Sequence, residues 1–261
     1  MKVPIILLLS FWLFAAAING HAQNTANDAS KNSKGKKPTI VFVHGLWADG
    51  SCWNKVITTL QAEGYDVVST QNPTTSLEDD VVATKRALDR TQGPVILVGH
   101  SWGGFVITEA GNDPRVVGLV YIAAFAPDVD ETAMDLLGKA APNDLTKYFQ
   151  IANGFITLSE EGIKKAFAAD LSVAQQLQLY ATQTPASQSV FAAKNTVPAW
   201  KQKPSWYLVA KNDQAINPDL ERLMAKRINA KTIETASSHL IMLAKPNEVV
   251  KMIKEAAIHK Y

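Results

Sequence analysis

The sequence predicts an α/β protein, in which a doubly wound, mostly parallel sheet carries an inserted helical cap. From residue 38 onward, apolar runs of strand length alternate with stretches of helical spacing. This alternation is typical of successive βαβ units. It stops between about residues 127 and 198, where helical patterns recur without a clear strand. A chain of 261 residues fits one domain, so we expect a single domain over residues 38–261 with a cap at about 127–198.

Each predicted element rests on its own local pattern. The run at 39–44 is almost wholly apolar, as expected for a strand that is buried on both faces. Two segments of the cap, Thr157–Glu160 and Ser172–Gln175, fit the capping box that begins a helix. The predicted strands are 39–44, 65–69, 94–99, 116–124, 206–210 and 231–235, and the predicted helices are 53–63, 77–90, 102–110, 218–229 and 246–259.

The first 22 residues have the features of a secretory signal peptide. Lys2 precedes an apolar run from Val3 to Ala17, and small residues flank position 22. The run is shorter than the roughly 20 residues that a membrane-spanning helix needs. We therefore expect cleavage after Ala22, no stable membrane anchor after cleavage, and a secreted or periplasmic protein. The polar residues 23–37 are expected to form a disordered leader.

Composition limits the remaining classes of function. Hydrophobic residues make up 47 % of the chain, charged residues 19 %, and the formal net charge is +2. Basic residues form no run interleaved with aromatic residues, so we expect no nucleic-acid partner. The single cysteine, Cys52, cannot form an internal disulfide and is expected to be a small packed residue.

The strongest chemical signal is the segment Gly99-His100-Ser101-Trp102-Gly103, which lies between a predicted strand and a predicted helix. This G-x-S-x-G pattern in that context indicates a nucleophile elbow. The turn is so sharp that side chains at Gly99 and Gly103 would collide with each other or with neighbouring strands. We therefore predict that Ser101 is the nucleophile.

A serine nucleophile needs a general base, and elimination among five histidines gives one candidate. His21 lies in the predicted signal peptide, and His44 ends a strand. His100 is expected to point away from the nucleophile, and His259 lies near the end of the last helix. His239, in a loop between the last strand and the last helix, is therefore the predicted base.

Two aspartates could orient that base. Asp213 follows the strand 206–210 after a short loop, and Asp128 follows the strand that ends at residue 124. The order serine, acid, histidine is met by both. Asp213 is the preferred acid, because Asp128 can equally be a residue that begins the first helix of the cap.

Acyl transfer also needs N–H donors for the developing oxyanion. The backbone N–H of Trp102, directly after the nucleophile, is one predicted donor. The N–H of Leu46, in the loop after the first strand, is the other, since Gly45 lets that backbone approach closely. This chemistry requires no organic cofactor and no metal.

Four segments together resemble the α/β-hydrolase superfamily, and within it the branch of plant methylesterases, hydroxynitrile lyases and small bacterial esterases. The resemblance extends from about residue 37 to residue 258. It implies the fold predicted above and the same Ser101, Asp213 and His239 triad. The segments are Val43–Trp53, Gly99–Gly104, Pro204–Asp213 and Ser238–Pro246.

Two positions separate hydrolases from lyases in that branch. Lyases carry Thr where this chain has Gly45, and Lys where it has Leu240. The sequence therefore favours an exported serine carboxylesterase that cleaves small, mainly apolar esters, as a monomer or homodimer. The alternatives are a hydroxynitrile lyase or perhydrolase that uses the same triad, and a ligand-binding protein with a hydrolase-like fold.

Overall fold

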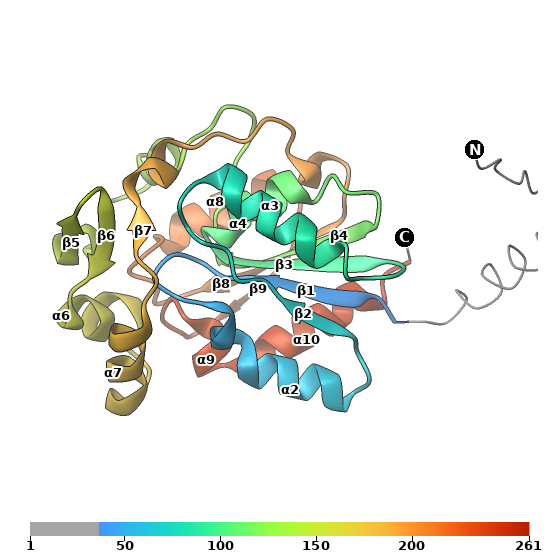
Figure 1. The fold of residues 1–261 in the computed structure, drawn as a ribbon, viewed down its shortest axis with the longest axis horizontal. Coiled ribbons are helices and arrows are strands. Elements are labelled where there is room, and N and C mark those ends of the chain that lie inside the picture. The colour runs from blue at the N-terminus through green and yellow to red at the C-terminus, as the bar shows by residue number, and fades with distance from the viewer. Residues whose placement is uncertain (1–36, 261) are drawn as a thin grey trace, which may run out of the picture. The chain divides into compact units, whose positions relative to one another are not determined.

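The computed structural model describes residues 37–260, folded around a six-stranded sheet (Figure 1). The predicted signal peptide and all but the last residue of the predicted leader lie outside the described residues. All neighbouring strands of this sheet are parallel, in the order β2-β1-β3-β4-β8-β9. The strands are β1 (Thr39–Val43), β2 (Val67–Ser69), β3 (Val95–Ser101), β4 (Val116–Ala124), β8 (Ser205–Ala210) and β9 (Lys231–Thr235).

Helices cover both faces of the sheet, which confirms the doubly wound fold (Figure 1). One face carries α2 (Asn54–Ala62), α9 (Ile241–Ala244) and α10 (Pro246–Ala257), and the other carries α3 (Leu77–Leu88), α4 (Gly103–Ala110) and α8 (Pro218–Arg227). Every residue of β1, β3 and β8 is buried. The hydrophobic core therefore lies on both sides of the central strands, as the continuous apolar runs predicted.

Local signals fix where α3 begins. Ser76 has an extended backbone, and its hydroxyl accepts a hydrogen bond from the N–H of Asp79. The first turn holds three acidic residues, which the positive end of the helix dipole favours. One of these residues, Asp80, is fully buried, whereas its neighbour Asp79 is exposed.

The cap is not wholly helical, so that part of the prediction was wrong. It contains a three-stranded sheet in the order β5-β6-β7, in which β5 and β6 form an antiparallel hairpin. Asn153 and Gly154 connect these two strands with φ values of 51° and 80°, the left-handed geometry of a tight hairpin turn. The cap strands are β5 (Phe149–Ala152), β6 (Phe155–Leu158) and β7 (Ala186–Ser187).

The remaining cap elements are short. Ser172 and Gln175 form the predicted capping box of α7 (Val173–Thr182). The other expected box is absent because Thr157 lies in β6, and Ser159 caps the next helix instead. Besides α7, the other cap elements are α5 (Ala133–Leu137), α6 (Glu160–Gly162), a π-helical turn (Ile163–Phe167), and the 3-10 turns Leu145–Tyr148 and Gln188–Ala192. Two further 3-10 turns, Gly50–Trp53 and Ala199–Lys201, lie outside the cap.

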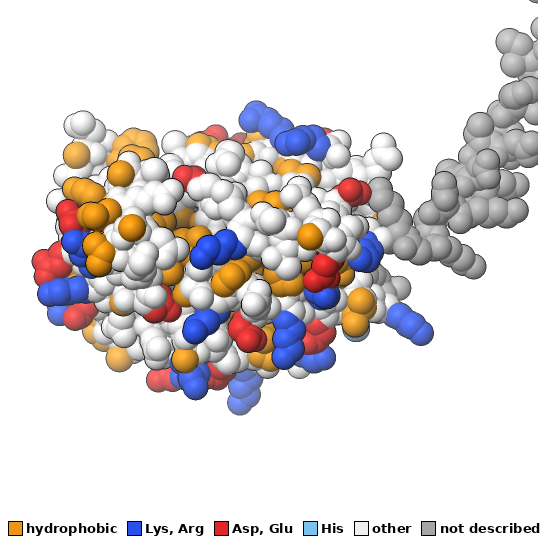
Figure 2. Space-filling view, turned by 90° about the horizontal axis from the view of Figure 1, so that it is seen from below, with side chains coloured by type: hydrophobic (Ala, Val, Ile, Leu, Met, Phe, Trp, Pro, Cys, Tyr) orange, Lys and Arg blue, Asp and Glu red, His pale blue; other side chains and the backbone are white. Residues whose placement is uncertain are grey.

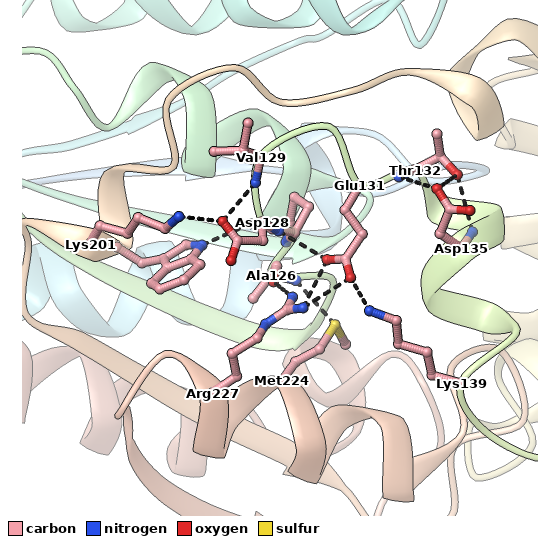
Figure 3. A network of polar contacts seen from close by, with 12 residues as sticks. Ala126, Asp128, Val129, Glu131, Thr132, Asp135, Lys139, Lys201, Met224 and Arg227 are labelled. Atoms are coloured by element: carbon pink, nitrogen blue, oxygen red, sulfur yellow. Dashed lines mark hydrogen bonds and ion pairs between the residues drawn. The ribbon is translucent and has the colours of Figure 1, made fainter.

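A polar cluster fastens the start of the cap to α8 (Figure 3). Glu131 accepts hydrogen bonds from the guanidinium of Arg227 at 3.0 Å and from the N–H of Asp128 at 2.9 Å, and it also pairs with Lys139. Val129 and Asn195 form a parallel bridge, so the two ends of the cap leave the core side by side.

The face drawn in Figure 2 carries charges of both signs. Figure 2 shows acidic and basic side chains interspersed over one face, with no segregated region of either sign. Within residues 37–260, no helix has the length and apolar character needed to cross a bilayer.

Candidate active site

Ser101 occupies the turn between β3 and α4 in a strained conformation. Its φ is 53°, a left-handed value that non-glycine residues rarely adopt. The predicted reason for the flanking glycines is confirmed. A Cβ on Gly99 would lie 2.6 Å from the carbonyl oxygen of Gly103, and a Cβ on Gly103 would lie 2.5 Å from that of Val43. The turn can therefore form only with glycine at both positions.

The fold brings together Asp213, which follows the end of β8, and His239, which follows the end of β9. The Nδ1 of His239 lies 2.5 Å from Oδ2 of Asp213, and both side chains are almost completely buried. The other carboxylate oxygen accepts hydrogen bonds from the N–H groups of Ala215 at 2.6 Å and Ile216 at 3.0 Å. Because Asp213 accepts from Nδ1, the neutral ring presents an unprotonated Nε2.

The Nε2 of His239 is buried and has no hydrogen-bond partner among the described residues. No hydrogen bond joins it to the Ser101 hydroxyl in this part of the chain. The two residues are connected through His100, whose ring packs 4.5 Å from that of His239 and whose Nε2 donates to the His239 carbonyl at 3.1 Å. Burial and the neighbouring His239 lower the pKa of His100 well below its usual value, so His100 stays neutral.

Asp128, the other candidate acid, lies elsewhere. Its carboxylate pairs with Lys201 at 2.5 Å and accepts a hydrogen bond from the N–H of Val129 (Figure 3). These contacts hold the start of the cap. Of the two aspartates that the sequence left open, the structure brings only Asp213 to His239.

The two residues predicted to supply oxyanion donors, Leu46 and Trp102, line one cavity together with Ser101. The cavity has a volume of about 420 Å³ and lies between the strand ends and the cap. Among the described residues, none with a charged side chain lines it. Its apolar walls include Trp47, Phe125, Met134, Leu137, Leu145, Phe149, Ile156, Phe191, Ile216 and Leu220, and its few polar residues are Ser101, Asn143, Thr146 and Asn217.

Sequence analysis did not predict the contacts that hold residues 236–238, the loop directly before His239. Asp170, from the cap, accepts hydrogen bonds from the hydroxyl of Ser237 at 2.9 Å and the N–H of Ser238 at 2.8 Å. Phe167 of the π-helical turn packs its ring 5.3 Å from that of His239. Neither residue has a local pattern that marks it, because both contacts join segments about 70 residues apart.

No group of three or more His, Cys, Asp or Glu side chains in residues 37–260 has the arrangement of a metal site. The free thiol of Cys52 is buried, and burial raises its pKa well above the usual value. The polar chemistry of the site thus resides in Ser101, His239, Asp213 and the neighbouring backbone.

Known proteins resemble this chain over almost all of the described region. A model described as the alpha/beta hydrolase family matches residues 40–252. The chain is 26% identical over 252 residues to an alpha/beta hydrolase of Aspergillus novofumigatus, a match that covers 85% of this chain and 97% of that protein. It is 31% identical over 124 residues to a carbendazim hydrolyzing esterase of Nocardioides, covering 42% of this chain and 51% of that protein. The crystal structure of polyneuridine aldehyde esterase superposes with a TM-score of 0.75 at 17% identity, covering 85% of this chain and 99% of that one.

Proposed function

The chain belongs to the alpha/beta hydrolase family, and from that premise we propose that it hydrolyses carboxylic esters of small, mainly apolar substrates through an acyl-enzyme on Ser101. The observation that carries the proposal is the arrangement of His239. Its Nδ1 is held by Asp213 at 2.5 Å, and its buried Nε2 has no partner within the described residues. A nitrogen held in this way can act as a general base, because its lone pair remains available to accept the proton of a nucleophile.

In the proposed reaction, Nε2 of His239 takes the proton of Ser101 as the serine oxygen attacks the ester carbonyl. The carbonyl oxygen gains the negative charge and accepts hydrogen bonds from the N–H groups of Leu46 and Trp102. Collapse of this intermediate breaks the bond to the alcohol oxygen, which receives the proton from His239. Water then attacks the acyl-enzyme with the same base, and releases the acid.

The chemistry of the cavity supports an uncharged substrate. Its walls are aliphatic and aromatic, and no charged side chain among residues 37–260 lines it. A carboxylate or ammonium group on a substrate would lose its hydration there without gaining an ionic partner. The carbendazim hydrolyzing esterase of Nocardioides and polyneuridine aldehyde esterase, which both resemble this chain, are named as esterases. These names support ester hydrolysis as the reaction class.

The same site gives less support to cyanohydrin cleavage. Leu240, directly after His239, is fully buried and apolar, so this position offers no ammonium group to stabilise a leaving cyanide. Gly45 packs closely on the nucleophile, since a Cβ there would lie 2.7 Å from that of Ser101.

The decisive experiment combines covalent labelling with turnover. Purified protein is treated with a serine-reactive fluorophosphonate and assayed on p-nitrophenyl esters of increasing acyl length, with mandelonitrile as the lyase substrate. We expect stoichiometric labelling of the wild type, rapid hydrolysis of the short uncharged esters, and no cyanide release. Labelling and turnover should both disappear in Ser101→Ala. A Ser101→Ala variant that keeps the wild-type rate would disprove the mechanism.

A matched pair of aspartate variants tests the assignment of the acid. Asp213→Asn leaves His239 without its orienting carboxylate and should lower kcat on the order of 10⁴-fold, as in other triads. Asp128→Asn removes only an ion pair with Lys201 and should leave kcat unchanged. The reverse pattern would assign the acid to Asp128.

We also propose that the protein is exported, on the basis of the apolar segment that follows Lys2. Expression of the full chain in a bacterial host, followed by N-terminal sequencing of the protein from the periplasm or medium, should give a chain that begins at Gln23. Recovery of the intact chain from the cytoplasm alone would contradict this.

A further inference from the structure

A fully buried carboxylate, Asp80, lies beside the active site and takes no part in the proposed reaction. It is in the first turn of α3, and it forms no ion pair in the part of the chain that the structure describes. Its partners are N–H groups. Oδ1 accepts from the N–H of Thr74 at 2.8 Å, and Oδ2 accepts from the indole N–H of Trp102 at 2.8 Å and from the amide of Asn72 at 3.4 Å.

One of these partners, Trp102, supplies an oxyanion donor in the proposed function. Its backbone N–H follows Ser101 directly, and its indole is fixed at both ends. The indole N–H is bound by Asp80, and the ring stacks on Phe105 with 4.9 Å between ring centroids. The bond to Asp80 therefore sets where the Trp102 residue lies on the elbow.

The other donor, Leu46, is fixed through the ring of His44. The N–H of Asn72 donates to Nε2 of His44 at 3.2 Å, so the neutral ring carries its proton on Nδ1. That Nδ1 donates to the carbonyl of Gly45 at 2.9 Å. Burial lowers the pKa of His44, which keeps the ring in this neutral state.

The Gly45 carbonyl and the Leu46 N–H belong to one planar trans peptide and point in opposite directions. Holding that carbonyl against His44 therefore aims the Leu46 N–H away from the His44 ring. Leu46 itself lines the cavity with Ser101. The orientation of this donor thus depends on the tautomer of His44, and the tautomer depends on Asn72.

Asn72 joins the two halves of the arrangement. Its side-chain amide donates to Asp80 and lies 3.4 Å from both Oδ2 of Asp80 and the His44 carbonyl. We propose that Asp80 is a positioning residue that holds both oxyanion donors in place, acting through the indole of Trp102 on one side and through Asn72 and His44 on the other. This inference rests on the proposed function, since it assigns a role in the same oxyanion hole.

The primary test is Asp80→Asn, which replaces one acceptor oxygen with an NH₂ group that faces other N–H donors. Oxyanion donors act on the transition state more than on the bound ester, so kcat should fall while KM changes little. Loss of one donor typically lowers kcat by about 10²- to 10³-fold, so we expect a loss of about 10- to 100-fold for donors that are displaced rather than removed. The Ki of phenylboronic acid, which forms a tetrahedral adduct with active-site serines, should rise by a similar factor.

Asp79→Asn is the matched control, because it makes the same change one residue earlier on the same helix. Asp79 is exposed and contacts only the local hydroxyls of Thr75 and Ser76 in the described structure. The kcat, KM and boronate Ki of Asp79→Asn should equal those of the wild type. A purely structural role for Asp80 would lower the melting temperature of Asp80→Asn but leave kcat per phosphonate-titrated site unchanged, and that result would overturn the proposal.

A milder second variant keeps the test valid if Asp80→Asn does not fold. Trp102→Phe keeps an aromatic ring on Phe105 and removes the N–H that Asp80 binds, together with part of the volume of the indole. We expect a several-fold loss of kcat with little change in KM, and a Trp102→Phe variant that keeps the wild-type kcat would overturn the proposal. Where Asp80→Asn does fold, the double variant Asp80→Asn/Trp102→Phe should lose less than the product of the two single losses, because both substitutions act through one contact. Full multiplication of the two losses would contradict the proposal. If the wild type itself neither hydrolyses esters nor reacts with the phosphonate, the proposed function fails first.

Discussion

Glu221 offers a test of how a buried acid next to the triad responds to pH. It lies on α8, is completely buried, and accepts a hydrogen bond from the N–H of Ala210 at 3.1 Å from Oε2. Its other oxygen has no partner among the described residues. Burial first, and the charge of neighbouring Asp213 second, raise its pKa well above the ordinary value of 4.5. Glu221 is therefore protonated in the folded protein at pH values where it ionises in the unfolded chain.

The sign of the effect on stability follows from proton binding. Above the pKa of the unfolded chain, the folded state holds a proton that the unfolded state has lost, so raising the pH favours unfolding. The free energy of unfolding of the wild type should then fall by about 1.4 kcal/mol per pH unit because of this one group, until the folded pKa is reached. Glu221→Gln preserves the shape and the neutral state, and it removes this dependence.

The assay is urea denaturation of both proteins at pH 5, 6, 7 and 8, followed by tryptophan fluorescence. We expect the stability of Glu221→Gln relative to the wild type to increase with pH and to level off once the pH exceeds the pKa of Glu221 in the folded protein. Glu109→Gln is the control: burial acts to raise the Glu109 pKa, but hydrogen bonds from Thr196 and Asn195 outweigh it and lower the pKa overall. Glu109 is therefore ionised in both states above pH 5, and its variant should show a constant difference. A difference in the free energy of unfolding between Glu221→Gln and the wild type that stays constant with pH would refute the reasoning.

Two further predictions concern packing. A Cβ on Gly104 would lie 1.9 Å from the carbonyl oxygen of Phe125, so Gly104→Ala should lower the free energy of unfolding by about 3 kcal/mol or more, as severe overpacking does; Gly138→Ala, where the nearest atom is at 3.5 Å, is the control and should change it little. Because the Cys52 thiol is buried with a raised pKa, it should react with Ellman's reagent only at the rate of unfolding, and fast reaction of the native protein would contradict its buried position.

The parallel core could be predicted because its signals are local. Continuous apolar runs specify strands that are buried on both faces, and the G-x-S-x-G pattern between a strand and a helix marks the elbow within five consecutive residues. The prediction of a wholly helical cap was wrong for a different reason. The helical patterns between about residues 127 and 198 predict a helical cap, although Asn153-Gly154 within this region is a strong signal for a two-residue hairpin turn. This turn signal is present in the sequence, and over so short a segment it outweighs helical spacing of apolar residues.

The supporting residues of the site could not be predicted, because only long-range contacts distinguish them. Asp80 stands beside Glu78 and Asp79 in a first turn where acidic residues are expected for the helix dipole alone. Only one of the three is buried, and its partner Trp102 lies 22 residues away. Asp170 likewise resembles an ordinary polar residue of the cap until the fold places it on the loop before His239.

Burial of acids in this molecule follows the proposed chemistry. Asp80, Asp213 and Glu221 are each at most 1 % exposed, and none pairs with Lys or Arg in the described residues. Acidic side chains without a Lys or Arg partner are almost never buried so completely, since desolvation disfavours their charged forms. Asp80 binds the indole of Trp102 on the elbow, Asp213 binds His239, and Glu221 binds the N–H of Ala210 at the end of the strand that precedes Asp213. A fold under selection for stability alone would replace them with apolar residues, so we infer that they are retained because they fix donors and acceptors before a substrate binds. On this argument, apolar substitutions that stabilise the protein at these positions should also slow it.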